Sequence, residues 1–460
     1  MSIGEFNGAP ERGVGARLTA RSRLPSVNSK RHSGFGAPGA ARLVPWAVAT
    51  GASPVPLSSP RRPVTPSDLP IAPPSAPSPG VELPAPAMPL RRRRPDDPEP
   101  SGKVNLLDLV PAEAGRVLRE FAAAHAQPAY RANQVVPRLW QRPVRSFDEI
   151  TELPKAFREL LAEHFELPRL QCATLQRSSD GTQKFLFRLA DGQAVETVAI
   201  PDEGRMTFCI SSQAGCALKC SFCATGVMGF ARNLRPSEIA GQVRELALLD
   251  EEPLRPTNIV FMGMGEPLMN WKAVDPTLTI LNDALGFGIG ARHITVSTVG
   301  VLPGIVALGE RPEQFRLALS IHAPNDELRA ALMPINTKYP LADVIEAAKT
   351  FDRRTTFEYV MLGGVNDGSE HARQLAQLAR DCRAFVNLIP LHPGGAGNFT
   401  PTSAAEIQRF ARELRGGGVE VAIRRSRGMD ISAACGQLRV ERLGRRAPGR
   451  PEDDRDVQVA

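Results

Sequence analysis

Three cysteines in the stretch "GCALKCSFCATG" have the types and spacing for metal chemistry: Cys216, Cys220 and Cys223 form a C-x-x-x-C-x-x-C pattern. Such short gaps allow one loop to turn its thiolates toward a single centre. Structural zinc needs four ligands, often two C-x-x-C pairs, and no second pair or nearby histidine is present. An iron–sulfur cube also usually takes four cysteines. With three, one iron keeps an open position at which a small molecule can bind and react.

Polar residues follow three of the apolar stretches downstream. "MGMGEPL" (262–268) follows "NIVF"; its glycines permit close backbone approach, and Glu266 offers a carboxylate to an ammonium group. A plain Gly-Pro turn is the alternative. Ser297 ends "HITVS", and Ser320 and His322 end "LALSIH". Ligands bind at the carboxyl ends of parallel strands, which favours a binding role. Helix capping is the alternative for each serine.

Four further cysteines lie outside this loop. Cys209 precedes the loop on a predicted strand, and Cys435 lies in "SAACGQL", after the last predicted strand. Both could be buried core residues, the commonest fate of a free cysteine. The position of Cys435 nevertheless predicts that its segment returns to the ligand-binding end of the sheet. Cys172 and Cys382 have apolar neighbours in sequence, and we expect both in the core.

From about residue 205 the chain alternates predicted strands with predicted helices such as "PSEIAGQVRELALL" and "LADVIEAAKTF". This pattern favours an α/β fold with a parallel sheet and crossover helices. Six or seven units are too few for a closed eight-stranded barrel. A partial barrel fits, and a doubly wound sheet is the alternative. The strand candidates are "MTFCIS", "TNIVFMG", "RHITVST", "FRLALSI", "TTFEYVM", "AFVNLIP" and "GVEVAIR".

The rest of the chain divides by composition and periodicity. Residues 1–103 are predicted to be a disordered tail, because residues 1–100 hold 20 of the 42 prolines. Apolar spacing predicts a small helical module over 104–168 with Trp140 in its core. A "DG" turn between alternating stretches predicts a β-hairpin extension over 169–204. The sheet domain then covers 205–442, and 443–460 is predicted to be a flexible tail.

The charge and cysteine content limit the possible classes of protein. Most of the formal net charge of +7 lies in residues 1–100, so it does not show that the folded part binds RNA. That basic tail is either solvated or an organelle transit peptide. Seven cysteines in 460 residues are too few for a disulfide scaffold and favour a reducing, cytoplasmic compartment. The sequence contains no run of eighteen apolar residues, so no membrane span is predicted.

The cysteine spacing resembles that of radical S-adenosylmethionine (AdoMet) enzymes. Three stretches together resemble the RlmN/Cfr family of radical-AdoMet RNA methyltransferases: "CISSQAGCALKCSFCATGVMGFARNL", "FMGMGEPL" and "SRGMDISAACGQL". The resemblance runs from about residue 104 to 442 and includes the helical module, which in that family is an accessory RNA-binding domain. It implies a partial (β/α)6 barrel, a [4Fe–4S] cluster and AdoMet.

The resemblance also implies a role for individual residues. The three loop cysteines hold the cluster, and AdoMet chelates its open iron. Cys435 is methylated by a first AdoMet, and a second AdoMet gives the radical that activates this methyl group. Glu196 accepts a proton, and Cys209 releases the product by forming a disulfide with Cys435. His392 stands where the family usually has an asparagine that contacts AdoMet. The implied AdoMet contacts are Gly265, Glu266, Ser297, Ser320, Ile321, His322 and His392.

The implied activity is methylation of carbon 2 of an adenine in 23S rRNA and of the adenine 3′ to the anticodon in tRNAs. Adenine carbons 2 and 8 have no nucleophilic lone pair, whereas a carbon radical can add to them. Alternatives are carbon-8 methylation, as in the Cfr branch, an RNA-binding iron–sulfur protein without catalysis, and a radical enzyme acting on a small molecule. A one-electron reductant such as flavodoxin and a monomeric state are also expected.

Overall fold

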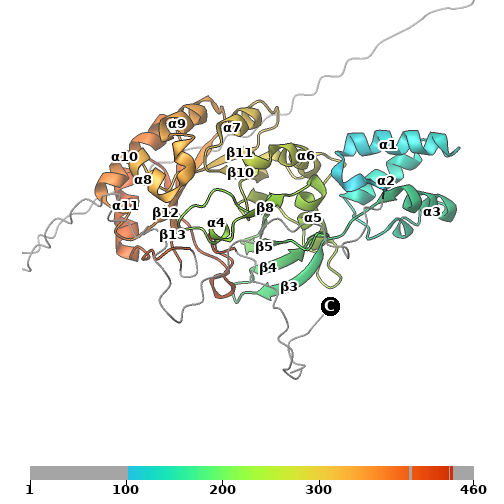
Figure 1. Cartoon of the computed structure of the whole chain (residues 1–460), viewed down its shortest axis with the longest axis horizontal. Helices are drawn as coiled ribbons and strands as arrows, with labels where there is room; N and C mark the ends of the chain where they lie inside the picture. Colours follow the sequence, from blue (N-terminus) through green and yellow to red (C-terminus); the bar gives the residue numbers. More distant parts are fainter. Residues whose placement is uncertain (1–101, 393–395, 435, 439–460) are drawn as a thin grey trace, which may run out of the picture. The chain divides into compact units, whose positions relative to one another are not determined.

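The computed structural model describes residues 102–392, 396–434 and 436–438 (Figure 1). The predicted tail over 1–103 lies outside these ranges up to residue 101, and the predicted C-terminal tail over 443–460 and Cys435 lie outside them as well. Among the described residues, no helix has both the length and the apolar character that a membrane span requires.

The predicted helical module consists of α1 (Pro111–Ala124), α2 (Arg131–Leu139) and α3 (Lys155–His164). Pro111 occupies the first turn of α1, where its missing N–H costs no helical hydrogen bond. Trp140 is fully buried among the apolar side chains of the module, as predicted. The apolar faces of the three short helices therefore share one small core.

This module packs against the helices that follow the first parallel strands. The core of the module includes Ala240 of α5 (Pro236–Ala247) and Ile280 of α6 (Trp271–Asn282). The fully buried Arg244 of α5 donates a hydrogen bond of 3.2 Å from Nε to the carbonyl oxygen of Leu139. The module is thereby held to the α/β part of the chain by apolar packing and by a buried guanidinium.

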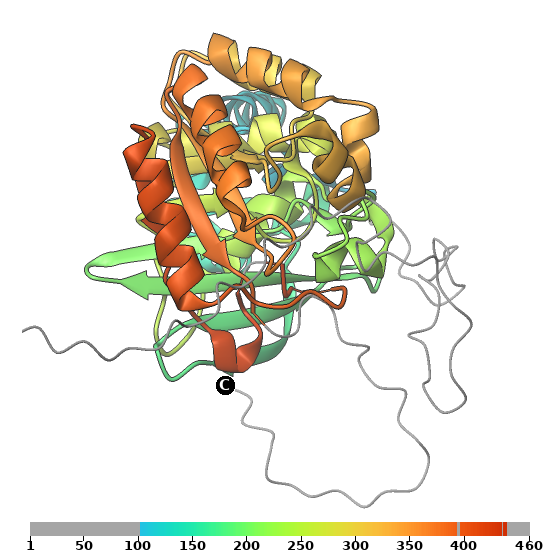
Figure 2. The same cartoon turned by 90° about the vertical axis from the view of Figure 1, so that its left-hand side faces the viewer.

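The α/β part is built on one ten-stranded sheet (Figures 1 and 2). Every neighbouring pair from β6 to β14 is parallel, and helices lie in the crossovers, as the alternating pattern predicts. The helices after α6 are α7 (Leu302–Gly309), α8 (Asp326–Leu332), α9 (Leu341–Thr350), α10 (Ser369–Asp381) and α11 (Ala404–Gly416). The strand order is β14 (Val421–Ile423), β13 (Phe385–Pro390), β12 (Thr355–Met361), β11 (Arg316–Ser320), β10 (Ile294–Thr298), β9 (Asn258–Phe261), β6 (Arg205–Cys209), β5 (Ala194–Asp202), β4 (Gln183–Arg188) and β3 (Gln171–Arg177).

The order of the parallel strands distinguishes the two predicted architectures. Each parallel strand lies beside the one that precedes it in the chain, from β6 through β9 to β14. A doubly wound sheet instead reverses its strand order at a switch point. Because parallel crossovers are right-handed, a sequential order places the helices on one face of the sheet. The sheet is therefore a partial barrel with six crossovers, and its edge strands β14 and β3 do not pair with each other.

The predicted hairpin is present, and it extends the same sheet. Strands β4 and β5 are antiparallel, and β5 is in turn antiparallel to β6, with Val198 opposite Cys209. A third strand, β3, covers the outer side of β4 and forms the sheet edge. Cys172 lies on this edge strand and is exposed, so the prediction that it is a core residue is wrong. Cys382 is half-buried, and its Sγ lies 3.7 Å from the carbonyl oxygen of Ile345.

Candidate active site

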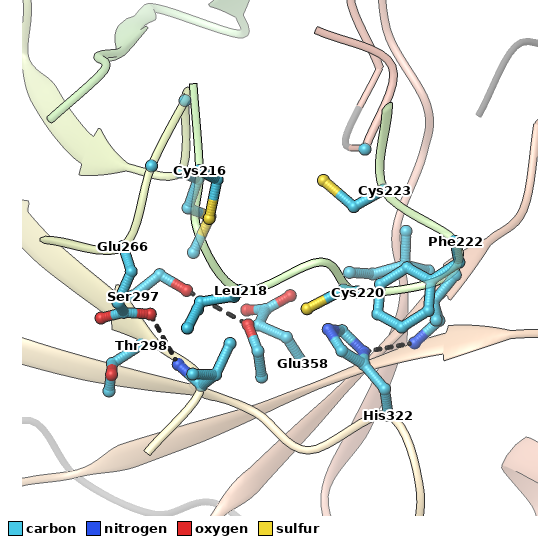
Figure 3. A pocket seen from close by; sticks show the side chains of 18 of the residues that line it. Cys216, Leu218, Cys220, Phe222, Cys223, Glu266, Ser297, Thr298, His322 and Glu358 are labelled. Atoms are coloured by element: carbon cyan, nitrogen blue, oxygen red, sulfur yellow. Dashed lines mark hydrogen bonds between the residues drawn. The ribbon is translucent and has the colours of Figure 1, made fainter. Parts of the chain in front are cut away.

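The cysteine loop lies between two very short strands. It follows β7 (Gln213–Gly215), and it runs through α4 (Ala224–Met228) into β8 (Phe230–Asn233), which is antiparallel to β7. The backbone N–H of Cys216 donates a 2.8 Å hydrogen bond to the carbonyl oxygen of Gly229, which closes the loop at its base. The sulfur atoms of Cys216, Cys220 and Cys223 point into a common space (Figure 3).

The environment of Cys216 and Cys220 opposes ionisation of their thiols in the absence of a metal. Burial raises the pKa of Cys216 to about 12 and also raises the pKa of Cys220. Leu218 and Phe222 of the same loop pack with them in an apolar cluster. Bound metal deprotonates a coordinating thiol and supplies the positive charge that a buried thiolate needs. The donor set is therefore suited to a thiophilic metal centre.

The arrangement fits a cluster better than a single ion. Within the part of the chain that the structure describes, no three His, Cys, Asp or Glu side chains are close enough to share one metal ion. A [4Fe–4S] cluster does not need such closeness, because each cysteine binds a different iron at its own corner. The residues present fit that group: three soft thiolates from one loop face an open space (Figure 3).

The Gly-Glu-Pro stretch lies beside the cysteine loop and presses closely on the chain that leads into it. Gly265 has a φ of +100°, and a Cβ atom there would lie 2.5 Å from Cβ of Gln213. Both the positive φ and the contact require glycine. The next residue, Glu266, is 2% exposed, and its backbone N–H donates to the side-chain oxygen of Gln213 at 2.8 Å.

Glu266 acts as a cap and also lines the cavity, so the turn interpretation holds in part, and binding of an ammonium group by Glu266 stays a prediction. Its carboxylate accepts hydrogen bonds of 3.0 Å from the backbone N–H groups of Leu268 and Val299. The first of these bonds caps the 3₁₀ helix Pro267–Asn270. Burial nevertheless dominates and raises the pKa of Glu266 to about 7. A positively charged ligand group would stabilise the ionised carboxylate.

The two serines at the strand ends line the same cavity. Ser297 of β10 and Ser320 of β11 have their Oγ atoms 3.5 Å apart. Neither serine caps the helix that follows, because Val301 precedes α7 and Asn325 precedes α8 at the capping positions. The capping alternative is therefore wrong for both, and both hydroxyls are placed to contact a ligand.

His322 is held as a neutral hydrogen-bond donor. Its Nδ1 accepts a 3.0 Å hydrogen bond from the backbone N–H of Val360, which leaves the proton on Nε2. Burial lowers the pKa of His322 to about 3, and its ring packs edge-on against Phe222 at a centroid distance of 4.8 Å. The adjacent Ile321 is fully buried in the main core and does not line the cavity.

One cavity joins the predicted residues. It holds about 1000 Å³ of empty space, its open mouth included. His392 also lines it, and its Nε2 is hydrogen-bonded to Oγ of Ser426. The predicted residues at its wall are Cys216, Cys220, Cys223, Gly265, Glu266, Ser297, Ser320, His322 and His392.

The sequence analysis missed two charged residues of this cavity, Glu358 and Arg424. Glu358 is buried on β12 and accepts a 2.9 Å hydrogen bond from the amide of Asn387. Burial raises the pKa of Glu358. A carboxylate inside the otherwise apolar "TTFEYVM" was the available signal, because a buried acid needs a specific partner.

The C-terminal segment returns to the cysteine loop. The backbone N–H of Ala224 donates a 2.9 Å hydrogen bond to the carbonyl oxygen of Gly436, and Oγ1 of Thr225 donates one of 2.7 Å to that of Leu438. Cys435 itself lies outside the described residues. Its neighbour Gly436 lines the same cavity as the loop cysteines, as expected of a segment that returns to this end of the sheet.

Glu196 and Cys209 lie on neighbouring strands and on one face of the sheet. Val198 is directly opposite Cys209 in the antiparallel register, and alternate residues of a strand share a face. Both Glu196 and Cys209 are buried. The buried Lys184 of β4 reaches the carboxylate of Glu196, with Nζ 3.3 Å from Oε1. The sequence analysis missed Lys184, although a lysine inside an apolar strand was a visible signal.

Comparison with family models shows the class of enzyme to which the chain belongs. Residues 210–377 match the family model of the Radical SAM superfamily. Residues 104–167, the helical module, match the model of the "Ribosomal RNA large subunit methyltransferase N-terminal domain". The chain is thus a radical-AdoMet enzyme with an N-terminal module of RNA methyltransferases.

Individual relatives then identify the family. A probable dual-specificity RNA methyltransferase RlmN of Gemmatimonas aurantiaca is 70% identical over 77% of this chain and 99% of its own length. The dual-specificity RNA methyltransferase RlmN of Anaeromyxobacter dehalogenans is 46% identical over 70% of this chain and 90% of its own. The crystal structure of a radical SAM methyltransferase from Sphaerobacter thermophilus aligns with a TM-score of 0.68 at 44% identity, covering 74% of this chain and all of that one. The chain belongs to the RlmN family of radical-AdoMet RNA methyltransferases.

Proposed function

We propose that the protein methylates carbon 2 of a specific adenine in 23S rRNA and of the adenine 3′ to the anticodon in tRNAs. Two kinds of observation support this: the relatives that cover most of the chain are named dual-specificity RNA methyltransferases, and the N-terminal module matches a ribosomal RNA methyltransferase domain. A flavodoxin-like reductant, a monomeric state and a cytoplasmic location belong to the same proposal.

Two groups would occupy the cavity. The three loop cysteines would hold a [4Fe–4S] cluster, and the cluster with AdoMet would supply a 5′-deoxyadenosyl radical. Glu266 would bind the methionyl ammonium group, because its buried carboxylate lacks a positive partner among the described residues and a charged hydrogen bond is strong in such a place. Ser297, Ser320 and the neutral Nε2–H of His322 would orient the rest of AdoMet.

The proposed relay passes the methyl group through Cys435. One AdoMet would methylate the Cys435 sulfur by ordinary displacement, and a second would give the radical that removes a hydrogen from this methyl group. The resulting carbon radical adds to the adenine. The observation that carries the proposal is the pair of hydrogen bonds, 2.9 and 2.7 Å, from Ala224 and Thr225 to Gly436 and Leu438. They tie the residues that directly follow Cys435 to the end of the cysteine loop.

Two further residues would complete the reaction. Glu196 would accept the proton that the adenine carbon loses, and Cys209 would release the methylated base by forming a disulfide with the Cys435 sulfur. Their position on one face of adjacent strands supports a shared role. General bases of this kind typically contribute about a hundredfold or more to a rate.

The test is an anaerobic assay on defined RNA. The reconstituted protein is incubated with AdoMet, a reductant and ribosomal RNA from a strain that lacks the modification, and the digested nucleosides are separated and weighed by mass spectrometry. The proposal predicts 2-methyladenosine. 8-Methyladenosine would assign the chain to carbon-8 chemistry, and AdoMet cleavage without any methyladenosine would show that the substrate is wrong.

A further inference from the structure

Lys184 is a buried cation that the reaction described above leaves without a task. Its side chain is 10% exposed, and that of its partner Glu196 is 5% exposed. Lysine is rarely buried unless it is paired, because the ammonium group loses its hydration. A buried ion pair adds little stability, since desolvation offsets the attraction. The position of this pair therefore calls for a reason other than stability.

The register of the strands shows which side of the sheet Lys184 occupies. Lys184 is opposite Val198 on β5, and Val198 is opposite Cys209 on β6. Residues directly opposite each other point to the same side of a sheet. Phe185 and Phe187 alternate with Lys184 along β4, so their buried side chains point to the opposite side of the sheet. Lys184 thus faces the side that holds Glu196 and Cys209.

Lys184 also reaches the segment that leads to Cys435. Its Nζ donates a hydrogen bond of 3.4 Å to the carbonyl oxygen of Ser432. Two carboxylates hold that segment in place. Asp180 accepts a 2.9 Å hydrogen bond from the backbone N–H of Gly428, and Asp430 accepts one of 2.5 Å from Oγ of Ser178. One ammonium group therefore contacts both the acidic residue and an anchored turn of the C-terminal segment.

We propose that Lys184 is a positioning residue that keeps the carboxylate of Glu196 ionised and aimed at the adenine bound beside Cys435. The inference rests on the proposed function, in which Glu196 is the proton acceptor. The adduct left by radical addition holds one unpaired electron, which would return to the oxidised cluster. The carbon–hydrogen bond at the methylated carbon breaks, its electron pair restores the aromatic ring, and the proton forms a bond to a Glu196 oxygen. Lys184 transfers no proton in this step.

The consequence is a defined pH dependence. Without the ammonium group, burial favours the protonated form of Glu196 and raises its pKa, so the acidic limb of the rate profile moves to higher pH. Other titratable groups near this face are Cys209 on β6, Asp202 on β5, Asp180 beyond β3, and Arg424, Arg427 and Asp430 on the C-terminal segment. All of these stay unchanged when only Lys184 is replaced.

Lys184→Met is the informative variant, because methionine keeps an unbranched stem of similar length and lacks the charge. Lys184→Arg keeps a cation at the same place. Lys272→Met serves as a matched control, since Lys272 is exposed on α6 and away from the cavity. Each reconstituted variant is assayed anaerobically with ribosomal RNA over a pH series. The readouts are the methylation rate, the yield of 5′-deoxyadenosine and the fraction of RNA attached covalently to protein.

The inference predicts that Lys184→Met methylates at least about tenfold more slowly at neutral pH and that its acidic limb moves up by about one pH unit or more. 5′-Deoxyadenosine should still form, and protein–RNA adduct should accumulate because proton removal is slow. Lys184→Arg should restore the wild-type profile, and Lys272→Met should match wild type.

Either of two results would overturn it. Lys184→Met could keep the wild-type profile, or it could lose rate equally at every pH without accumulating adduct, as a purely structural role requires. Should Lys184→Met fail to fold, Lys184→Gln takes its place under the same criteria. A wild-type protein that cleaves AdoMet and methylates no RNA would instead refute the proposed function itself.

Discussion

The backbone N–H of Ala224 donates a 2.9 Å hydrogen bond to the carbonyl oxygen of Gly436, although 212 positions separate the two residues along the chain. Ala224 directly follows the third loop cysteine, and Gly436 directly follows Cys435. The contact joins the proposed source of the radical to the proposed carrier of the methyl group. Because the bond is between backbone groups, it fixes this proximity regardless of either side chain.

Thr225 reinforces this contact, and its hydroxyl can be removed with little change in shape. Thr225→Val loses the 2.7 Å hydrogen bond to the carbonyl oxygen of Leu438. We expect stability to fall by about 1 kcal/mol, and methylation per 5′-deoxyadenosine formed to fall several-fold as the segment loosens. Thr277→Val removes a comparable buried hydroxyl, bonded to Ala273 within α6, and should leave this ratio unchanged. If Thr225→Val and Thr277→Val showed the same ratio of methylation to 5′-deoxyadenosine, the Thr225 hydrogen bond would not position the segment of Cys435.

Glu266 should make AdoMet binding depend on pH. Its pKa is raised to about 7 without ligand, whereas binding of an ammonium group requires the carboxylate. Affinity should therefore fall about tenfold for each pH unit below 7, measured by anaerobic equilibrium dialysis of the cluster-loaded protein. His322 contributes nothing there, because its pKa of about 3 leaves it neutral. The AdoMet-free protein should show the opposite trend, losing stability as pH rises from about 4.5 through 7, because burial favours the neutral acid.

The control for this prediction is Glu266→Gln, which should bind AdoMet weakly and with little dependence on pH. Burial also raises the pKa of Glu358, which lines the same cavity. A pH dependence that persists in Glu266→Gln and disappears in Glu358→Gln would transfer the role to Glu358.

The three loop cysteines should be individually necessary for the cluster. Cys220→Ala removes one of three thiolates, and the remaining two cannot hold a cube that already lacks a fourth protein ligand. We expect iron content and visible absorbance after reconstitution to fall nearly to background. Cys172→Ala, at an exposed thiol of the edge strand, should bind as much iron as wild type. Retention of the cluster in Cys220→Ala would mean that another residue provides the ligand.

Gly265→Ala tests the close approach of the Gly-Glu-Pro stretch to the chain before the cysteine loop. The new Cβ would meet Cβ of Gln213 at 2.5 Å, and the φ of +100° is unfavourable for alanine. We expect a loss of about 1–3 kcal/mol in unfolding free energy, with a marked fall in AdoMet affinity as Glu266 shifts. Gly416→Ala, which has open space around it at the end of α11, should leave AdoMet affinity unchanged and should not lower the unfolding free energy. Unchanged AdoMet binding in Gly265→Ala would show that this contact does not position Glu266.

The parts of the fold that could be predicted from sequence depend on local patterns. The buried parallel strands are continuous apolar runs between helices, and each of the seven predicted strands after residue 205 overlaps a strand of the sheet. The loop cysteines and Glu266 stand out because short-range spacing alone brings their groups together. Trp140 is buried in the core of the helical module, as the apolar spacing of that module predicts.

The features that could not be predicted from the sequence depend on how distant segments of the chain pair in the sheet. Cys172 has apolar neighbours along the chain, but it is exposed because β3 forms the sheet edge, which depends on strand order. Lys184 and Glu196 pair across β4 and β5, and only the register of the hairpin brings them together. Ile321 lies between two polar residues of the cavity wall, and its side chain points into the core, so only its backbone is available for the predicted contact with AdoMet.

The route of the methyl group is the central claim, and isotope labelling tests it most directly. AdoMet with a fully deuterated methyl group is supplied to the protein and RNA under anaerobic conditions, and the methyladenosine product is weighed. A relay through Cys435 loses one deuterium to 5′-deoxyadenosine, so the account predicts a product methyl group with two deuterium atoms. A product with all three would show that the methyl group reaches the adenine intact, and it would contradict the relay.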